Sequence, residues 1–195
     1  MKTTAIRRTR ILLTTAAAAG LVAAASGSPC LDYARTEFGK YLPQADFRLE
    51  LKTDAALGTD AFRIREEGGA LVITGGNERG CLYGLYSFLE KEGGAGFYSS
   101  WCERPPRTDT KLRKGLDYSE KPAIPLRECL YKDAENNVLK AKLRLNASVS
   151  GRGAEKEIER IGGLDGRFAP GLGSCHTFFS ILPPKLHFKD HPEFY

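Results

Sequence analysis

The sequence lacks the residue spacings by which many enzymes and metal proteins are recognised. No two of its five cysteines form a C-x-x-C pair, no H-E-x-x-H occurs, and no Ser/His/Asp order or nucleophile elbow stands out. These absences argue against a closed zinc site, and we expect neither a bound metal nor a cofactor. One or two disulfides are compatible with the odd number of cysteines, but we interpret all five as buried small hydrophobic residues: Cys30, Cys81, Cys102, Cys129 and Cys175.

Acidic residues are absent from the first 31 positions, which contain four of the 29 Lys and Arg residues. Without those four, 25 basic residues stand against 24 acidic ones, so the net charge of +5 belongs almost entirely to the N-terminal stretch. The near-neutral remainder excludes nucleic acid as a partner. With 42% hydrophobic and 10% aromatic residues the chain can build a core, which excludes the disordered and fibrous classes.

A hydrophobic run long enough to cross a membrane is also missing. The apolar stretch 11–25 covers about 15 residues, whereas a membrane span needs about 20. Basic residues before it and three alanines at its end predict a secretory signal over residues 1–25. A twin-arginine signal at Arg7-Arg8 and a lipidated Cys30 are weaker alternatives. We therefore expect a secreted, periplasmic or cell-surface protein without a stable membrane span.

Hydrophobic periodicity predicts an α+β domain over residues 30–107. Apolar residues recur at helical spacing in two segments, and four others have the alternation or the short apolar runs of strands. The helices are predicted at 31–42 and 82–89, and the strands at 47–51, 62–65, 70–73 and 95–98. Glu67-Gly68-Gly69 joins the two middle strands as a hairpin. A small mixed β-sheet with both helices packed on one face would bury all these stripes together.

The composition changes after this domain. The segment Glu103–Pro122 has three prolines and a run of charges, which predicts a linker, placed at residues 108–122 between the two domains. Seven glycines from Gly151 to Gly173 indicate a long loop. We therefore expect residues 31–107 to fold, and residues 122–195 to be poorly ordered or prone to aggregation by themselves.

Three local motifs have both a functional and a structural interpretation. Residues 75–80, GGNERG, lead from a strand into a helix but lack the ending of a phosphate loop, so a tight turn is favoured. His187 and His191 would share a face of a helix, but neighbouring prolines argue against that helix and its metal site. Asn146-Ala147-Ser148 matches a glycosylation sequon, which matters only in a eukaryotic secretory pathway.

Residues 79–90, RGCLYGLYSFLE, resemble a helix in the N-terminal domain of family-67 α-glucuronidases. The same pattern marks the small domain that precedes the barrel in β-N-acetylhexosaminidases. The resemblance continues through Gly96-Phe97-Tyr98, Trp101 and Glu103. Core packing is the favoured role for the two tyrosines within the helix, Tyr83 and Tyr86.

Further segments extend the resemblance towards the C-terminus. Residues 125–127 and 143–146 resemble the first two barrel strands of those enzymes. Residues 176–179, 183–184 and 191–195 resemble a large secreted bacterial family, domain of unknown function 4838, which is related to these glycosidases. The resemblance covers most of residues 31–195.

The resemblance implies a secreted glycoside hydrolase that acts on complex polysaccharides, with a small α+β domain followed by a (β/α)₈ barrel. Such a barrel takes about 250 residues, and only 74 of the 195 residues follow Lys121. We therefore expect residues 123–195 to be the incomplete start of the barrel. The chain would be an accessory region that is inactive alone, because the catalytic acids are expected beyond Tyr195.

Three substrate-binding candidates follow from the resemblance. Arg127 matches a position where related enzymes hold sugar hydroxyls, which suits the fixed fork of guanidinium donors; a structural ion pair is an equally good interpretation. Asn146 and His176 would donate hydrogen bonds to a sugar, although a structural role is slightly favoured for both. The alternative function is a non-catalytic secreted module that binds carbohydrate or acts as a scaffold, and an exposed Trp101 would favour binding.

Overall fold

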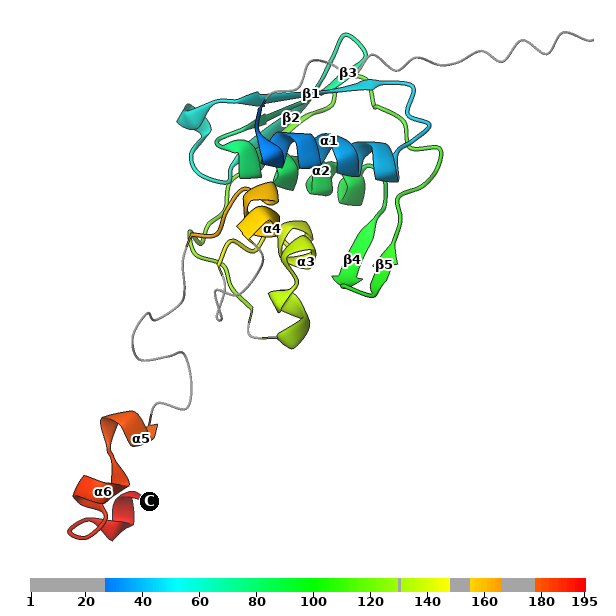
Figure 1. Cartoon of the computed structure of the whole chain (residues 1–195). Helices are drawn as coiled ribbons and strands as arrows, with labels where there is room; N and C mark the ends of the chain where they lie inside the picture. The colour runs from blue at the N-terminus through cyan, green and yellow to red at the C-terminus, as the bar shows by residue number, and fades with distance from the viewer. Residues whose placement is uncertain (1–26, 130, 148–154, 166–177) are drawn as a thin grey trace, which may run out of the picture.

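The computed structural model describes residues 27–129, 131–147, 155–165 and 178–195, and Figure 1 shows their arrangement. The predicted signal segment 1–25, Cys175 and His176 lie outside the described residues. None of the helices in the described part of the chain is both long and apolar enough to cross a membrane.

A four-stranded mixed sheet forms the centre of the domain. Its strands follow the order β1 (Arg48–Thr53), β3 (Ala70–Gly75), β2 (Phe62–Glu67) and β6 (Asp117–Glu120). Strand β1 runs parallel to β3, and the other pairs are antiparallel. The β2–β3 hairpin turns at Gly68 and Gly69, which both have positive φ, as glycine tolerates. A short 3₁₀ helix, η1 (Ala55–Leu57), links β1 to β2.

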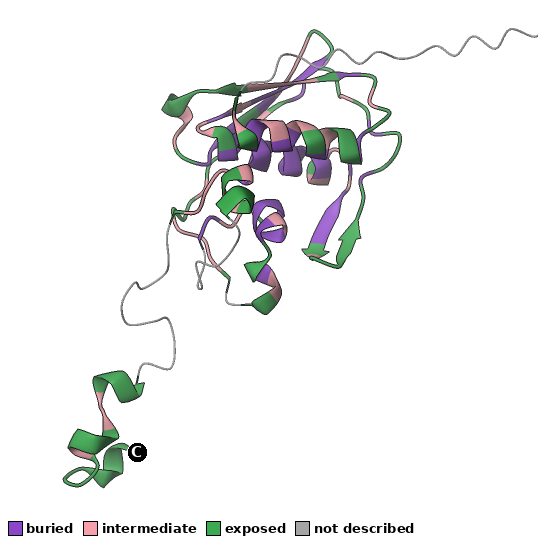
Figure 2. Ribbon diagram, in the orientation of Figure 1, coloured by how far each residue is buried: buried purple, intermediate pink, exposed green. Residues whose placement is uncertain are grey.

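Two long helices lie on the same side of this sheet (Figure 1). Helix α1 (Pro29–Tyr41) begins at Ser28, whose Oγ accepts the backbone N–H of Leu31. Helix α2 (Glu78–Lys91) begins at Asn77 and is buried from Arg79 to Leu89, because it lies between the sheet and the remaining helices (Figure 2). The predicted α+β class, mixed sheet and helices are therefore confirmed.

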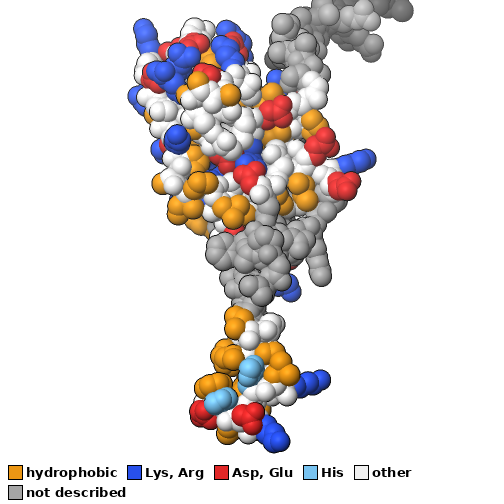
Figure 3. Space-filling view, turned by 90° about the vertical axis from the view of Figure 1, so that its left-hand side faces the viewer, with side chains coloured by type: hydrophobic (Ala, Val, Ile, Leu, Met, Phe, Trp, Pro, Cys, Tyr) orange, Lys and Arg blue, Asp and Glu red, His pale blue; other side chains and the backbone are white. Residues whose placement is uncertain are grey.

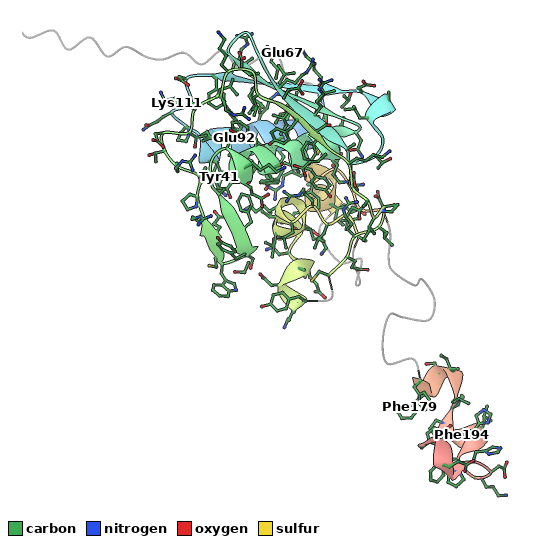
Figure 4. The ribbon with its side chains drawn as sticks, turned by 180° about the vertical axis from the view of Figure 1, so that it is seen from behind. Tyr41, Glu67, Glu92, Lys111, Phe179 and Phe194 are labelled. Atoms are coloured by element: carbon green, nitrogen blue, oxygen red, sulfur yellow. The ribbon has the colours of Figure 1, made fainter. Side chains whose placement is uncertain are left out.

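Aromatic rings fill the core at one end of the helices. Tyr83 and Tyr86 are 1% and 0% exposed, which confirms their predicted packing role. Tyr41, at the end of α1, lies beside the hairpin that follows α2 (Figure 4), and its ring centroid is 5.8 Å from that of Phe97. Phe97 also meets Tyr86 edge-on at 5.4 Å. These contacts attach the hairpin to both helices.

The predicted last strand and linker have different roles from those expected. Strand β4 (Gly96–Ser99) is present, but it pairs with β5 (Cys102–Arg104) in a separate two-stranded sheet. Strand β6 lies inside the segment predicted as a linker and forms an edge of the main sheet. Its pairing with β2 includes an ion pair between Arg63 Nη2 and Asp117 Oδ2 at 2.7 Å. Such a contact between distant residues leaves no local signature in composition.

Part of the segment after residue 122 packs on the domain. It forms η2 (Lys132–Glu135), α3 (Asn137–Lys142) and α4 (Glu155–Arg160), and Ala141 and Ile161 are each 1% exposed within the same hydrophobic core. The expectation that all of residues 122–195 is poorly ordered is wrong for these elements, since burial against α1 and α2 stabilises them.

Neither segment expected as a barrel strand forms one. Residues 125–127 are irregular, and residues 143–146 follow the end of α3 through a turn in which Arg144 has a φ of 58°. The two segments nevertheless lie side by side, because the backbone N–H of Asn146 donates to the carbonyl oxygen of Arg127 at 3.1 Å.

The last described segment lies away from the domain (Figures 1 and 4) and contains α5 (Phe178–Ile181), α6 (Pro184–His187) and η3 (Pro192–Phe194). Figure 3 shows hydrophobic side chains gathered on it. Tyr195 contacts the rings of Phe178, Phe179 and Phe188.

The cysteines divide into two groups. Cys30 and Cys81 are buried, as interpreted from the sequence, whereas Cys102 and Cys129 are exposed, so that interpretation is wrong for the second pair. All four are free thiols.

Candidate functional site

Asp60 is the centre of a buried polar cluster at the start of β2. Its side chain is 1% exposed, and its backbone has a φ of 61°, a left-handed conformation that Asp accepts more readily than most residues. Its carboxylate receives Arg79 Nε at 2.7 Å and Arg79 Nη2 at 3.1 Å. Asn77 Nδ2 donates to it at 3.1 Å, so the residue that caps α2 also orients the carboxylate.

Arg127 enters this cluster from beyond the predicted linker. Its Nη2 lies 2.6 Å from Asp60 Oδ2, and its Nε donates to the carbonyl oxygen of Arg144 at 2.8 Å. Its Nη1 donates to the carbonyl oxygens of Ile124 and Pro125. With four hydrogen bonds inside the protein and 17% of its side chain exposed, Arg127 holds the local backbone and Asp60 together.

Asn146 completes the same cluster and is 0% exposed. Its Nδ2 donates to Asp165 Oδ2 at 2.7 Å, to the carbonyl oxygen of Pro125 at 2.7 Å and to Asp60 Oδ2 at 3.2 Å. Its Oδ1 accepts the backbone N–H of Arg127 at 2.7 Å. The structure thus brings together two of the three candidates from the sequence, Arg127 and Asn146, while His176 lies outside the described residues.

Arg79 connects the cluster to a third segment. Its Nη2 lies 2.6 Å from Asp165 Oδ2, and its Nη1 donates to the carbonyl oxygen of Gly163 at 3.0 Å. Asp60, Arg79 and Asp165 were not predicted as site residues from the sequence. The Arg-Gly pair that begins the α2 motif was the only available signal for Arg79, and nothing local marked either aspartate.

The cluster is charged and balanced, with two guanidinium groups facing two carboxylates. Burial acts to raise the pKa of Asp60, but hydrogen bonds and charge from Arg79 and Arg127 outweigh it and hold that pKa below its ordinary value. Burial likewise acts to lower the pKa of Arg79, and its bonds to Asp165 and Asp60 raise it instead. Asp60 is therefore ionised at neutral pH and cannot serve as a proton donor there.

A cavity of about 210 Å³ adjoins the cluster, between α2 and the segments on either side of residue 125. Phe62, Tyr83 and Leu143 give it apolar walls, and charges of both signs line it, including Glu120, Lys121 and Arg144. The ring of Tyr83 is not open to this space for stacking, because the Arg127 guanidinium lies over it, 5.8 Å from the centroid.

The described residues contain no group of three or more His, Cys, Asp or Glu placed to hold a metal ion. His187 ends α6, and His191 Nδ1 lies 3.0 Å from Glu193 Oε1 while its ring stacks on Phe194. No family model, no curated protein and no solved structure matches the chain.

Proposed function

We propose that this chain is the N-terminal accessory region of a secreted glycoside hydrolase that acts on complex polysaccharides. In this proposal the α+β domain holds the first part of a following (β/α)₈ barrel in a fixed position. The observation that carries the proposal is the Asp60-centred cluster. Arg127 and Asn146, which follow β6 in the sequence, both bind Asp60 of the α+β domain. Asp60 is in turn paired with Arg79 of α2.

The cluster suits a positioning role because its groups are buried and mutually dependent. Removing one partner of a buried ion pair costs about 3–5 kcal/mol, since the other charge stays buried without compensation. Movement of residues 124–127 away from the domain would remove the Arg127 donor from Asp60. A backbone hydrogen bond also joins residues 127 and 146, so the two segments lie side by side, although neither is a strand.

Three carboxyl groups of the described residues do not have the property that hydrolysis requires. A glycosidase needs one carboxyl group with a raised pKa to protonate the leaving group. Asp60 is buried beside Arg79 and Arg127, Glu103 and Glu120 are half-buried beside lysines, and the pKa of each of the three is lowered. In this proposal catalysis belongs to groups other than these three.

The mass and activity of the native secreted protein test the proposal. We expect a protein of several times 21.4 kDa that releases sugars from a complex polysaccharide. A native mass at or slightly below 21.4 kDa, with no hydrolysis, would contradict the accessory role.

Limited proteolysis tests the positioning role in the chain itself. We expect the wild type to resist cleavage over residues 121–129, between β6 and η2, and Arg127→Met to be cleaved there. Arg113→Met is the matched control, because Arg113 is 61% exposed and lies 3.5 Å from Glu92 at the surface. Equal cleavage of wild type and Arg127→Met between β6 and η2 would count against the proposal.

One observation favours the alternative, a secreted carbohydrate-binding module. The side chain of Trp101 is 80% exposed at the turn of the β4–β5 hairpin, where an indole gains nothing from core packing.

A further inference from the structure

Three large aromatic side chains are exposed near the free end of the β4–β5 hairpin. Trp101 is 80% exposed in the turn, Tyr98 is 62% exposed on β4, and Tyr131 is 62% exposed just before η2. We call these three residues the aromatic tip. Figure 1 shows the hairpin end and the segment before α3 at the end of the domain away from the main sheet.

A hydrogen-bonded junction holds the two parts of the aromatic tip together. The backbone N–H of Ser100 donates to Asp133 Oδ2 at 2.7 Å, and Ser100 Oγ donates to Asp133 Oδ1. These bonds lower the pKa of Asp133, so the junction keeps its acceptor charge at neutral pH. Trp101 follows Ser100 directly and Tyr131 precedes Asp133 by two residues, so both aromatic residues flank this junction.

The ring of Tyr98 lies over the backbone of Gly96. A Cβ added to Gly96 would be 2.4 Å from the Tyr98 hydroxyl oxygen and 2.6 Å from its Cζ, so the ring occupies the space a side chain would take. Phe97, between them, points the other way into the core. Part of the Tyr98 ring therefore packs on the hairpin backbone, and the rest of the ring faces solvent.

The chemistry of the aromatic tip selects among possible partners. No ring contact joins any of its three residues to another aromatic residue in the part of the chain that the structure describes. Two charged groups of the hairpin have partners within the protein: Glu103 pairs with Lys142 at 2.6 Å, and Arg104 Nε donates to the carbonyl oxygen of Gly94. A surface of open rings with polar edges suits an uncharged ligand that has flat apolar faces and many hydroxyls.

We infer that the aromatic tip, Tyr98, Trp101 and Tyr131, binds a neutral polysaccharide whose sugar rings stack on these side chains. The inference takes the carbohydrate class from the proposed function and adds a binding surface to it. The aromatic tip lies on the β4–β5 hairpin and just before η2, outside the Asp60-centred cluster. It would therefore bind the polysaccharide without contributing to the positioning of residues 124–127.

Retention of the secreted chain on insoluble neutral polysaccharides tests the inference, with cellulose, xylan and chitin as probes. Trp101 is the only tryptophan, so its emission reports on the aromatic tip alone. We expect retention on at least one polymer, with a blue shift of Trp101 emission on addition of its soluble oligosaccharides. Trp101→Ala should weaken retention by at least about tenfold, as loss of a central aromatic anchor does.

Two further variants and one control make the result specific. Tyr131→Ala should weaken binding while keeping the tryptophan signal, and Gly96→Ala should do so by displacing Tyr98. Phe188→Ala is the control, because Phe188 is 54% exposed on a different element. Unchanged circular dichroism would show that each variant is folded.

The inference is overturned by any of three results: no retention on any of the polymers, retention unaffected by Trp101→Ala, or a Trp101 response to phosphatidylcholine vesicles without one to polysaccharide. The last result would assign the aromatic tip to a lipid surface. The native mass and the resistance of residues 121–129 to cleavage do not depend on Trp101, so failure of this inference is separable from failure of the proposed function.

Discussion

The guanidinium of Arg79 and the carboxylate of Asp60 form an ion pair that is almost completely buried. Arg79 Nε lies 2.7 Å from Asp60 Oδ1, and the two side chains are 3% and 1% exposed. Burial of both charges costs hydration, so such a pair adds little net stability relative to an apolar pair, but its geometry is demanding. Because Asp60 also binds Arg127 and Arg79 also binds Asp165, the pair fixes three distant segments at once.

Replacing Asp60 by alanine should destabilise the fold strongly. The variant leaves the guanidinium groups of Arg79 and Arg127 buried without their shared carboxylate, and we expect a loss of about 3–5 kcal/mol in the free energy of unfolding. Urea denaturation followed by far-ultraviolet circular dichroism measures it. Asp117→Ala is the control, because its pair with Arg63 is exposed and should shift the midpoint much less. Equal shifts in both variants would contradict the role given to Asp60.

Stability should fall in acid through the titration of Asp60. Burial acts to raise its pKa, but the hydrogen bonds of Arg79 and Arg127 prevail, so its folded pKa lies below the unfolded value of about 3.9. A lowered pKa stabilises the fold above the unfolded pKa, and this contribution disappears as the pH falls through the folded pKa. Wild type and Asp60→Asn should therefore differ most near neutral pH and converge below about pH 4. A constant difference between them over that range would show that Asp60 does not titrate as described.

Two glycine-to-alanine substitutions should have opposite effects on stability. A Cβ at Gly76 would lie 1.7 Å from the carbonyl oxygen of Gly58, so Gly76→Ala must move backbone and should destabilise by about 1–3 kcal/mol. Gly39, within α1, has open space around the same position. Gly39→Ala should stabilise by about 0.5–1 kcal/mol, because alanine favours the helix. Thermal unfolding of the two variants and the wild type measures both effects: the midpoint should fall for Gly76→Ala and rise for Gly39→Ala.

The four described cysteines should separate by reactivity. Burial raises the pKa of Cys30 to about 12 and that of Cys81 to about 11, so both thiols are protonated as well as inaccessible at mildly alkaline pH. Cys102 and Cys129 are exposed. Alkylation with iodoacetamide and peptide mass mapping should label the second pair in the native protein and the first pair only after denaturation. Labelling of Cys81 as fast as Cys102 would show that α2 opens readily.

The sequence predicted those elements whose pattern is local. Helices α1 and α2 and the β2–β3 hairpin follow from apolar spacing and from Gly68-Gly69, and all are present. Strand β6 was missed because it is stabilised by partners such as Arg63, 54 residues from Asp117 in the sequence. A four-residue edge strand has too few side chains to be predicted from hydrophobic periodicity.

The candidate site was predicted in part for the same reason. Arg127 and Asn146 were selected by resemblance, and the structure places both in one cluster. Their partner Asp60 lies 67 residues before Arg127, and an aspartate in a turn is common in proteins. Only the packing of α2 against the sheet brings Arg79 to it, which no local pattern indicates.

The burial of Asn146 has a practical consequence for producing the protein. Oligosaccharide is transferred to a sequon while the chain enters the endoplasmic reticulum, before folding can hide the amide. A glycan on Asn146 Nδ2 would leave no room for its bonds to Asp60, Asp165 and Pro125. Yeast or insect cells would therefore secrete a glycosylated fraction that cannot close the cluster, whereas a bacterial host, or Ser148→Ala in a eukaryotic one, would give uniform material.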